Sequence, residues 1–218
     1  MPLSNPEHVP VVLHFAQAVR PRTVLDVGIG TGSYGLLLRQ SLDIGFGRVQ
    51  PDSWQTQIDG IEIFEPYRNP VWGYAYSRVL MGDIRALLPQ LHGYDLVLCN
   101  DVLEHFPRDE ARALVHQLLD HGRVLIATTP NRAYPQGAWG GNEAETHHSL
   151  LDATDFTGRV AQIVTGVTTC YVCTRHRELI YPLLLAADRC PVFTAGRPLN
   201  PFVRLRRKWR QWQLMRQR

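Results

Sequence analysis

The chain has 218 residues, a net charge of +3, 44% hydrophobic residues and 20% charged residues, values that fit a globular protein of one domain with appendages. Four cysteines do not form a disulfide framework in a chain of this size, and no apolar stretch is suited to a signal peptide or a membrane span, so we expect a reduced, cytoplasmic protein. Residues 204–218 carry seven basic residues and no acid, so taking their seven charges from the net charge of +3 leaves −4 on the rest of the chain. A nucleic-acid-binding face is therefore not an obvious feature of this acidic remainder.

The expected elements alternate between helices and strands along the chain. A helix over about residues 7–20 precedes the first strand, and Ser33 is suited to cap the helix after that strand. Strands are predicted at 23–27, 58–64, 78–82, 94–100 and 123–129, and helices at 33–42 and 108–120. This alternation produces right-handed crossovers and a mostly parallel sheet.

Two further strands, at 160–166 and 168–175, lie too close together for a helix between them. We expect them to pair as an antiparallel hairpin at one edge of the sheet. The predicted fold class is α/β, with a seven-stranded, mostly parallel sheet, helices on both faces and this hairpin at the edge. The predicted domain covers residues 1–175, with its core at about 22–175, and residues 176–218 form a C-terminal extension.

The stretch VLDVGIGTGSYG, residues 24–35, contains two overlapping glycine patterns. Gly30, Gly32 and Gly35 have the spacing of a dinucleotide-binding fingerprint, whereas Asp26 stands two residues before Gly28. A pyrophosphate is bound by backbone N–H groups and the positive end of a helix, and an acid beside it would repel it. The acid favours a cofactor with an amino group and a sulfonium, so the glycines serve close backbone approach instead of phosphate binding.

Two more acids follow the next two strands. Glu62 is placed to accept hydrogen bonds from both ribose hydroxyls, and Asp83 to accept one from an exocyclic adenine amine. Each acid could instead cap the helix that follows it. Ligands bind beyond the carboxyl ends of parallel strands, and three acids at three successive strand ends favour the cofactor role.

The order of these segments resembles that of class I S-adenosylmethionine-dependent methyltransferases over roughly residues 23–156. The segments are VLDVGIGTGSYG, GIE, MGDI, YDLVLCNDVLEHF and GRVLIATTPN, and NDVLEHF with TTPN is similar to ubiquinone-type and tailoring O-methyltransferases. The resemblance implies a Rossmann-like sheet, S-adenosyl-L-methionine as cofactor, and a small-molecule acceptor shaped partly by the unusual insertion at 43–57. The cofactor site that it implies consists of Asp26, Gly28, Gly30, Gly32, Tyr34, Glu62, Ile63, Asp83, Ile84 and Asn100.

Transfer to a hydroxyl acceptor needs a base, and histidine has a suitable pKa. His147 is the first choice because the resemblance extends to a Glu-x-His-x-Ser pattern at residues 145–149; His105, just after the fourth strand, and His148 are alternatives. A loop histidine could equally be solvated or brace the loop, and His105 could bond backbone at the start of its helix. Asp101 could orient the base or bind a substrate hydroxyl, or be a solvated acid.

No metal site is predicted from the sequence. Cys170 and Cys173 lie three apart on a strand, where their side chains point to opposite faces, and no second cysteine pair exists. The adjacent pair Asn100 and Asp101 lacks a third acid at a clear position. The strand exit CNDVLEH also lacks the signature of enzymes that methylate base amines, which favours a hydroxyl acceptor.

Two functions remain open at this point. The first is an enzyme that methylates a hydroxyl of a small molecule. The second is a non-catalytic cofactor-binding protein that engages RNA, a membrane or a partner through residues 204–218. On a helix, that segment has an apolar stripe opposite its arginines, which suits an anionic membrane surface or a partner, or packing on this protein's own domain or a second copy. The stripe consists of Leu205, Trp209, Trp212 and Met215.

Overall fold

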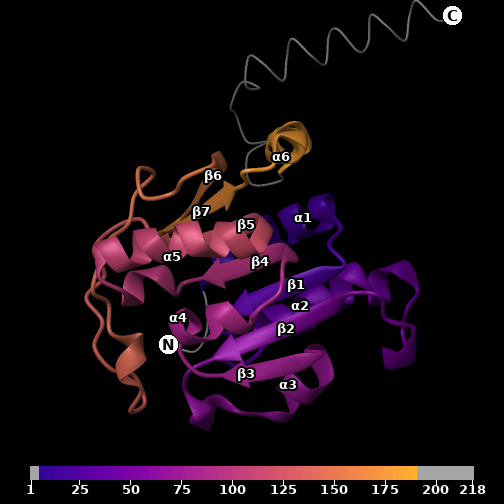
Figure 1. Ribbon diagram of the computed structural model, residues 1–218, viewed down its shortest axis with the longest axis horizontal. Coiled ribbons are helices and arrows are strands. Elements are labelled where there is room, and N and C mark those ends of the chain that lie inside the picture. The colour runs from indigo at the N-terminus through magenta and orange to yellow at the C-terminus, as the bar shows by residue number, and fades with distance from the viewer. Residues whose placement is uncertain (1–4, 191–218) are drawn as a thin grey trace, which may run out of the picture.

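A computed structural model describes residues 5–190, which form one seven-stranded sheet with the order β3-β2-β1-β4-β5-β7-β6 (Figure 1). The first five strands in this order are parallel, and β7 and β6 are antiparallel to their neighbours. The predicted fold class is therefore confirmed. The strands are β1 (Thr23–Val27), β2 (Gln57–Glu62), β3 (Arg78–Met81), β4 (Tyr94–Asn100), β5 (Gly122–Pro130), β6 (Arg159–Thr165) and β7 (Thr168–Cys173).

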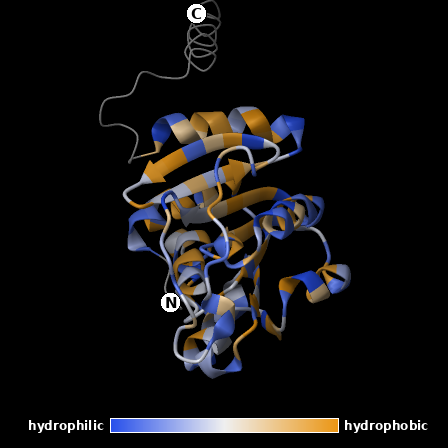
Figure 2. Ribbon diagram, turned by 90° about the vertical axis from the view of Figure 1, so that its left-hand side faces the viewer, coloured by the Kyte–Doolittle hydropathy of each residue, from blue (hydrophilic) through white to orange (hydrophobic). Residues whose placement is uncertain are grey.

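Helices cover both faces of the sheet, and each face has its own apolar core. α1 (Val9–Val19), α2 (Ser33–Leu42), α3 (Pro70–Ala75) and α6 (Arg177–Arg189) pack on one face. α4 (Ile84–Leu87) and α5 (Arg108–His121) pack on the other, and α5 buries the apolar stripe that its sequence predicts. Figure 2 shows hydrophobic residues along the strands, whereas the helices carry both hydrophobic and hydrophilic residues. No helix within residues 5–190 is long and apolar enough to cross a membrane.

The strand order places a topological switch point between β1 and β4. β2 lies on one side of β1 and β4 on the other, so the loops after β1 and β4 diverge at the carboxyl edge of the sheet. Ligands of open α/β sheets bind at such a point. In Figure 1 the arrowheads of β1, β2 and β4 point to the left, and the salmon-coloured segment that follows β5 runs down this same side.

The start of α2 differs from the prediction. Gly32, not Ser33, is the N-cap, and it adopts a left-handed conformation with a φ of 86°. A glycine is needed there because β-carbon-bearing residues rarely adopt this φ. Ser33 is the first helical residue, and its hydroxyl pairs with that of Thr31 at 3.0 Å.

The packed unit continues past residue 175. Leu183 and Ala186 of α6 are buried against the core that α1 shares, and the His14 ring donates a hydrogen bond to the Ala186 carbonyl at 2.7 Å. The predicted basic helix at 204–218 lies outside the described residues.

Candidate active site

A cavity of about 390 Å³ opens at the switch point. Nine of the ten residues predicted for the cofactor line it, and Gly32 does not. A β-carbon added at Gly32 would lie 3.0 Å from Trp72 Cδ1. Of the three predicted catalytic residues, His105 and Asp101 line the cavity and His147 does not, although its ring centroid lies 5.0 Å from that of His105. The alternative candidate His148 also lines the cavity.

Asp26 lies at the floor of this cavity, with only 2% of its surface exposed. The Tyr76 hydroxyl donates a hydrogen bond to Asp26 Oδ2 at 2.7 Å and accepts one from the Gly35 N–H at 3.0 Å. Burial raises the pKa of Asp26 to about 7, although the Tyr76 hydrogen bond opposes the increase. A cationic ligand would relieve this burial cost by pairing with the carboxylate.

The glycine loop has little capacity to bind a phosphate. The N–H groups of Gly28 and Ile29 donate to the Ile61 carbonyl, that of Gly32 donates to the Ile29 carbonyl, and that of Gly30 donates to Glu62 Oε2 at 2.8 Å. These four donors are therefore already used within the protein. Together with Asp26, they make the loop unsuited to a pyrophosphate.

Glu62 is not a helix cap but a clamp on the backbone. Its Oε1 accepts from the N–H groups of Ile63 and Phe64 at 3.0 Å, while Oε2 accepts from Gly30. Burial raises the pKa of Glu62, and these backbone hydrogen bonds oppose the increase. The carboxylate is thus fixed in position at the cavity wall, where its remaining lone pairs can accept from ribose hydroxyls.

Asp83 caps a helix, and its position at the cavity also leaves it free for the predicted adenine contact. It is the N-cap of α4 and accepts from the Arg85 N–H at 2.8 Å, and it also lines the cavity. The Arg85 guanidinium lowers the pKa of Asp83 through a side-chain hydrogen bond, so Asp83 remains an anion at neutral pH.

Asn100 provides a direct test of fit. Both side-chain polar atoms of this buried residue lack a hydrogen-bond partner within residues 5–190, as does the hydroxyl of Tyr34. Buried polar atoms of folded proteins are nearly always satisfied, so these groups indicate a polar ligand. The amino and carboxyl groups of S-adenosyl-L-methionine could provide the missing hydrogen-bond partners of Asn100 and Tyr34. The site therefore fits this cofactor.

Asp101 is held by contacts from two elements, β5 and the N-terminal 3-10 turn Pro6–His8 with its cap Asn5. It adopts a φ of 53°, its Oδ1 accepts from the Thr128 hydroxyl at 2.9 Å, and its Oδ2 accepts from the Asn5 N–H at 3.2 Å. His8 Nε2 lies 3.5 Å from Oδ2, and burial lowers the pKa of His8. Asp101 is therefore a braced residue and not a solvated loop acid.

His105 and His147 share one arrangement. His105 Nδ1 lies 3.2 Å from the Thr146 carbonyl, and His147 Nδ1 lies 2.7 Å from the Tyr134 carbonyl. Burial lowers the pKa of both imidazoles, which are therefore neutral at pH 7. With Nδ1–H donating to a carbonyl, the Nε2 atom of each ring has a free lone pair.

Comparison with known families decides the class of this site. The profile of a family described as "Methyltransferase domain" matches residues 9–163. The chain belongs to this family. A comparison of this chain with curated protein sequences found no match.

Solved structures are similar to the methyltransferase in fold. Magnesium protoporphyrin IX methyltransferase from Synechocystis PCC 6803, with bound SAH, has 19% identity and a TM-score of 0.55, over 76% of this chain and 81% of that one. An O-methyltransferase family protein from Burkholderia thailandensis has 16% identity and a TM-score of 0.54, over 76% and 55%. The N-terminal domain of EvdMO1, with SAH bound, has 16% identity and a TM-score of 0.54, over 79% and 83%.

Tyr76 is a functional residue that the sequence analysis missed. Its only sequence signal is the aromatic-rich segment 65–77, which the resemblance to methyltransferases does not account for. In the structure, its ring fills the space beside Gly35, where an added β-carbon would lie 2.3 Å from Tyr76 Cζ. Gly35 therefore serves the Tyr76–Asp26 contact and not a phosphate.

We expect Gly35→Ala to lower the free energy of unfolding of the methyltransferase by about 2–3 kcal/mol, because the buried Tyr76 ring has no room to retreat. Gly73→Ala is the matched control. It lies in α3 with nothing within 4 Å of its added β-carbon, and we expect no loss, since alanine is the better helix former. Urea unfolding at neutral pH measures both, and equal stability of the two variants would contradict the clash.

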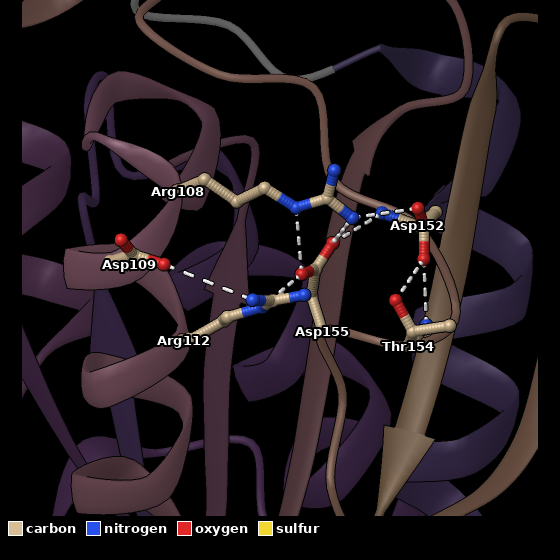
Figure 3. A network of polar contacts seen from close by, with 6 residues as sticks. All are labelled: Arg108, Asp109, Arg112, Asp152, Thr154 and Asp155. Atoms are coloured by element: carbon tan, nitrogen blue, oxygen red, sulfur yellow. Dashed lines mark hydrogen bonds and ion pairs between the residues drawn. The ribbon is translucent and has the colours of Figure 1, made fainter.

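The segment carrying His147 is fastened to α5 by an ionic network (Figure 3). The Asp155 carboxylate, whose side chain is 1% exposed, lies between the guanidinium groups of Arg108 and Arg112. Arg108 Nε donates to Asp155 Oδ1 at 2.9 Å, and the Asp152 N–H donates to Oδ2 at 2.7 Å. Burial opposes ionisation of Asp155, but the hydrogen bonds from Arg108, the Asp152 N–H and Arg112 together outweigh it and lower its pKa.

Asp155→Asn is expected to lower the free energy of unfolding by about 1–3 kcal/mol at pH 7, because a buried charge-assisted acceptor is lost. The wild-type pKa is lowered, so this contribution is complete above the unfolded-state pKa and disappears as the pH falls through the folded-state value. Asp109→Asn is the control, since Asp109 is 97% exposed and 3.8 Å from Arg112, and we expect almost no change. Unfolding curves at pH 7 that show equal losses would refute the ranking.

Proposed function

We propose that the methyltransferase binds S-adenosyl-L-methionine in this cavity and transfers its methyl group to a hydroxyl of a small-molecule acceptor. The observation that carries the proposal is the composition of the cavity. A buried carboxylate and an unpaired asparagine face a glycine loop whose N–H groups already have partners. That composition suits a cationic, phosphate-free nucleoside better than a dinucleotide.

The cofactor would be held at three points. Asp26 and Asn100 bind the methionine end, Glu62 accepts from the ribose hydroxyls, and Asp83, with Ile84, lies beside the adenine. When bound, the cofactor would supply a methyl group on a sulfonium. The acceptor oxygen would take this methyl group in line, with the sulfur as the leaving group. The protein's contribution is alignment and exclusion of water, which for reactions of this kind can reach ~7–11 kcal/mol.

The acceptor is activated at the His105 end of the cavity. His105 lines the wall next to Asp101, and its Nε2 lone pair is available because Nδ1 faces the Thr146 carbonyl. His147 does not line the cavity, so His105 is the better placed of the two to take a proton from the acceptor hydroxyl directly. Asp101 is fixed well enough to accept a hydrogen bond from a second substrate hydroxyl.

Calorimetric titration tests the cofactor assignment. We expect S-adenosyl-L-methionine and its demethylated product to bind with micromolar affinity, and NADH not to bind. Binding of NADH in place of the adenosyl compounds would overturn the assignment. Incubation of the protein with labelled cofactor and fractionated small molecules from a cell extract then identifies the acceptor, and absence of transfer to any fraction would count against a small-molecule substrate.

A further inference from the structure

A second cluster of reactive side chains adjoins the cavity. Glu104, His105 and His147 each offer one ligand atom, and these three atoms lie within 4.8 Å of one another. Glu104 and His105 belong to the 3-10 turn Leu103–His105 after β4, while His147 comes from the loop after β5. The cluster is therefore assembled from segments about forty residues apart, which explains why no sequence motif reveals it.

Glu104 is the most informative member. It is only 2% exposed, and its Oε2 atom has no hydrogen-bond partner in the part of the chain that the structure describes. A buried carboxylate oxygen without a partner is costly unless the group is protonated or a cation binds it, and burial raises the pKa of Glu104. None of the ion pairs within residues 5–190 gives Glu104 an arginine, and the neighbouring acids Asp101 and Glu145 are like charges.

The two imidazoles are oriented as metal ligands usually are. Each directs Nδ1 to a backbone carbonyl, of Thr146 for His105 and of Tyr134 for His147, so that Nε2 is the free donor atom. Metal-binding histidines commonly fix their tautomer in this way. The loop is also held close, since the N–H groups of His148 and Ser149 both donate to the Glu104 carbonyl, at 2.9 and 3.1 Å.

From these contacts we infer that Glu104, His105 and His147 bind a first-row divalent transition-metal ion at the acceptor end of the cavity. Two imidazole nitrogens and one carboxylate suit Mn²⁺, Fe²⁺, Co²⁺ or Zn²⁺ better than Mg²⁺ or Ca²⁺. Such an ion lies about 2.0–2.2 Å from nitrogen and oxygen ligands. Small side-chain rotations, chiefly of the half-exposed His147, bring the three ligand atoms to that distance.

The role of the ion rests on the proposed function, and it replaces direct deprotonation by His105, because the ion would occupy the Nε2 lone pair of that ring. His105 lines the cavity, so open coordination positions face the acceptor, and the acceptor hydroxyl binds there. Its proton passes to solvent, because the ion lowers the pKa of a bound hydroxyl. The oxygen then forms the bond to the methyl carbon while the carbon–sulfur bond breaks. That electron pair stays on sulfur, which becomes a neutral thioether, and the ion is unchanged.

The test is a titration of the untagged, chelator-treated protein with Co²⁺, followed by calorimetry and visible absorption. We expect one equivalent to bind, with the absorption of nitrogen and oxygen ligands. Glu104→Gln, His105→Gln and His147→Gln should each weaken binding at least tenfold. His116→Gln is the control, because this exposed histidine of α5 is outside the cluster, and it should bind Co²⁺ as the wild type does.

Three outcomes would overturn the inference. They are no Co²⁺ binding to the wild type, equal affinity in the wild type and all three variants, or an intense near-ultraviolet band that assigns the ion to cysteine thiolates. The product S-adenosylhomocysteine is titrated into the same preparations. If it binds while Co²⁺ does not, the metal site alone is refuted; if neither binds, the proposed function fails as well. His147→Gln tests the idea even if Glu104→Gln does not fold, because His147 lies near the surface.

Discussion

Asp26→Asn is expected to make the ligand-free protein more stable at pH 8 while weakening cofactor binding about a hundredfold or more. Burial raises the pKa of Asp26 to about 7, so ionising it in the folded state costs free energy that the unfolded chain does not lose. At roughly 1.4 kcal/mol for each pKa unit, removing this cost should stabilise the fold by about 1–3 kcal/mol after the new amide is desolvated.

The sign of this effect depends on pH. Between about pH 4 and 7 the folded protein holds a proton that the unfolded chain has lost, so wild-type stability falls as the pH rises through this window. The stability difference between Asp26→Asn and wild type should therefore be small near pH 4 and reach its full value above pH 7. Denaturant unfolding at several pH values measures it, and a difference independent of pH would contradict the raised pKa.

Asp59→Asn provides a control with the opposite sign. Asp59 is also a buried strand aspartate, but it has a cation partner, Arg78 Nε, at 2.9 Å, and it accepts from the Tyr94 hydroxyl at 2.8 Å. We expect this substitution to destabilise the fold by about 1–3 kcal/mol and to leave cofactor affinity unchanged. Stabilisation by both substitutions would show that the effect is not specific to the cofactor site.

The second large effect concerns turnover. We expect His105→Gln and His147→Gln each to lower methyl transfer by about 10²–10³-fold, and the double variant to be little worse than either single one, because ligands of one ion act as a unit. Cofactor affinity should stay within about twofold. Transfer of labelled methyl to the accepting extract fraction measures turnover, and His116→Gln, on the exposed side of α5, is the control.

A different pattern would distinguish a general base from a metal site. If His105 were the base by itself, His105→Gln would lose activity and His147→Gln, whose ring does not line the cavity, would keep most of it. Full activity of both variants would remove the pair from the mechanism and leave Asp101 and His148 as the remaining predicted polar side chains that line the cavity.

The cofactor half of the site was predictable from the sequence because its residues follow directly from strand ends. A short apolar strand that ends in glycines fixes Asp26 at a known place in a parallel sheet, and Glu62 and Asp83 follow by the same logic. What could not be predicted was the partner of Asp26. Tyr76 reaches it from fifty residues away, and only the packing of α2 against α3 brings the two together.

The acceptor half was less predictable because it depends on a long loop. The sequence analysis named His105 and His147. Which of the two lines the cavity depends on how residues 131–158 fold back over the 3-10 turn after β4. Glu104 was not considered, since a glutamate in a turn of charged residues gives no sign of being buried. The expectation that the chain has no metal site came from examining cysteines and neighbouring acids, whereas the candidate ligands come from distant segments.

The ionic network around Asp155 affects how an enzyme of this kind could acquire new acceptors. The salt bridges of Asp155 with Arg108 and Arg112 attach the C-terminal part of the loop 131–158 to α5. α5 contributes none of the groups that hold Asp26. Residues between the two anchored ends could be exchanged to suit a new acceptor while the nucleoside-binding half kept its geometry.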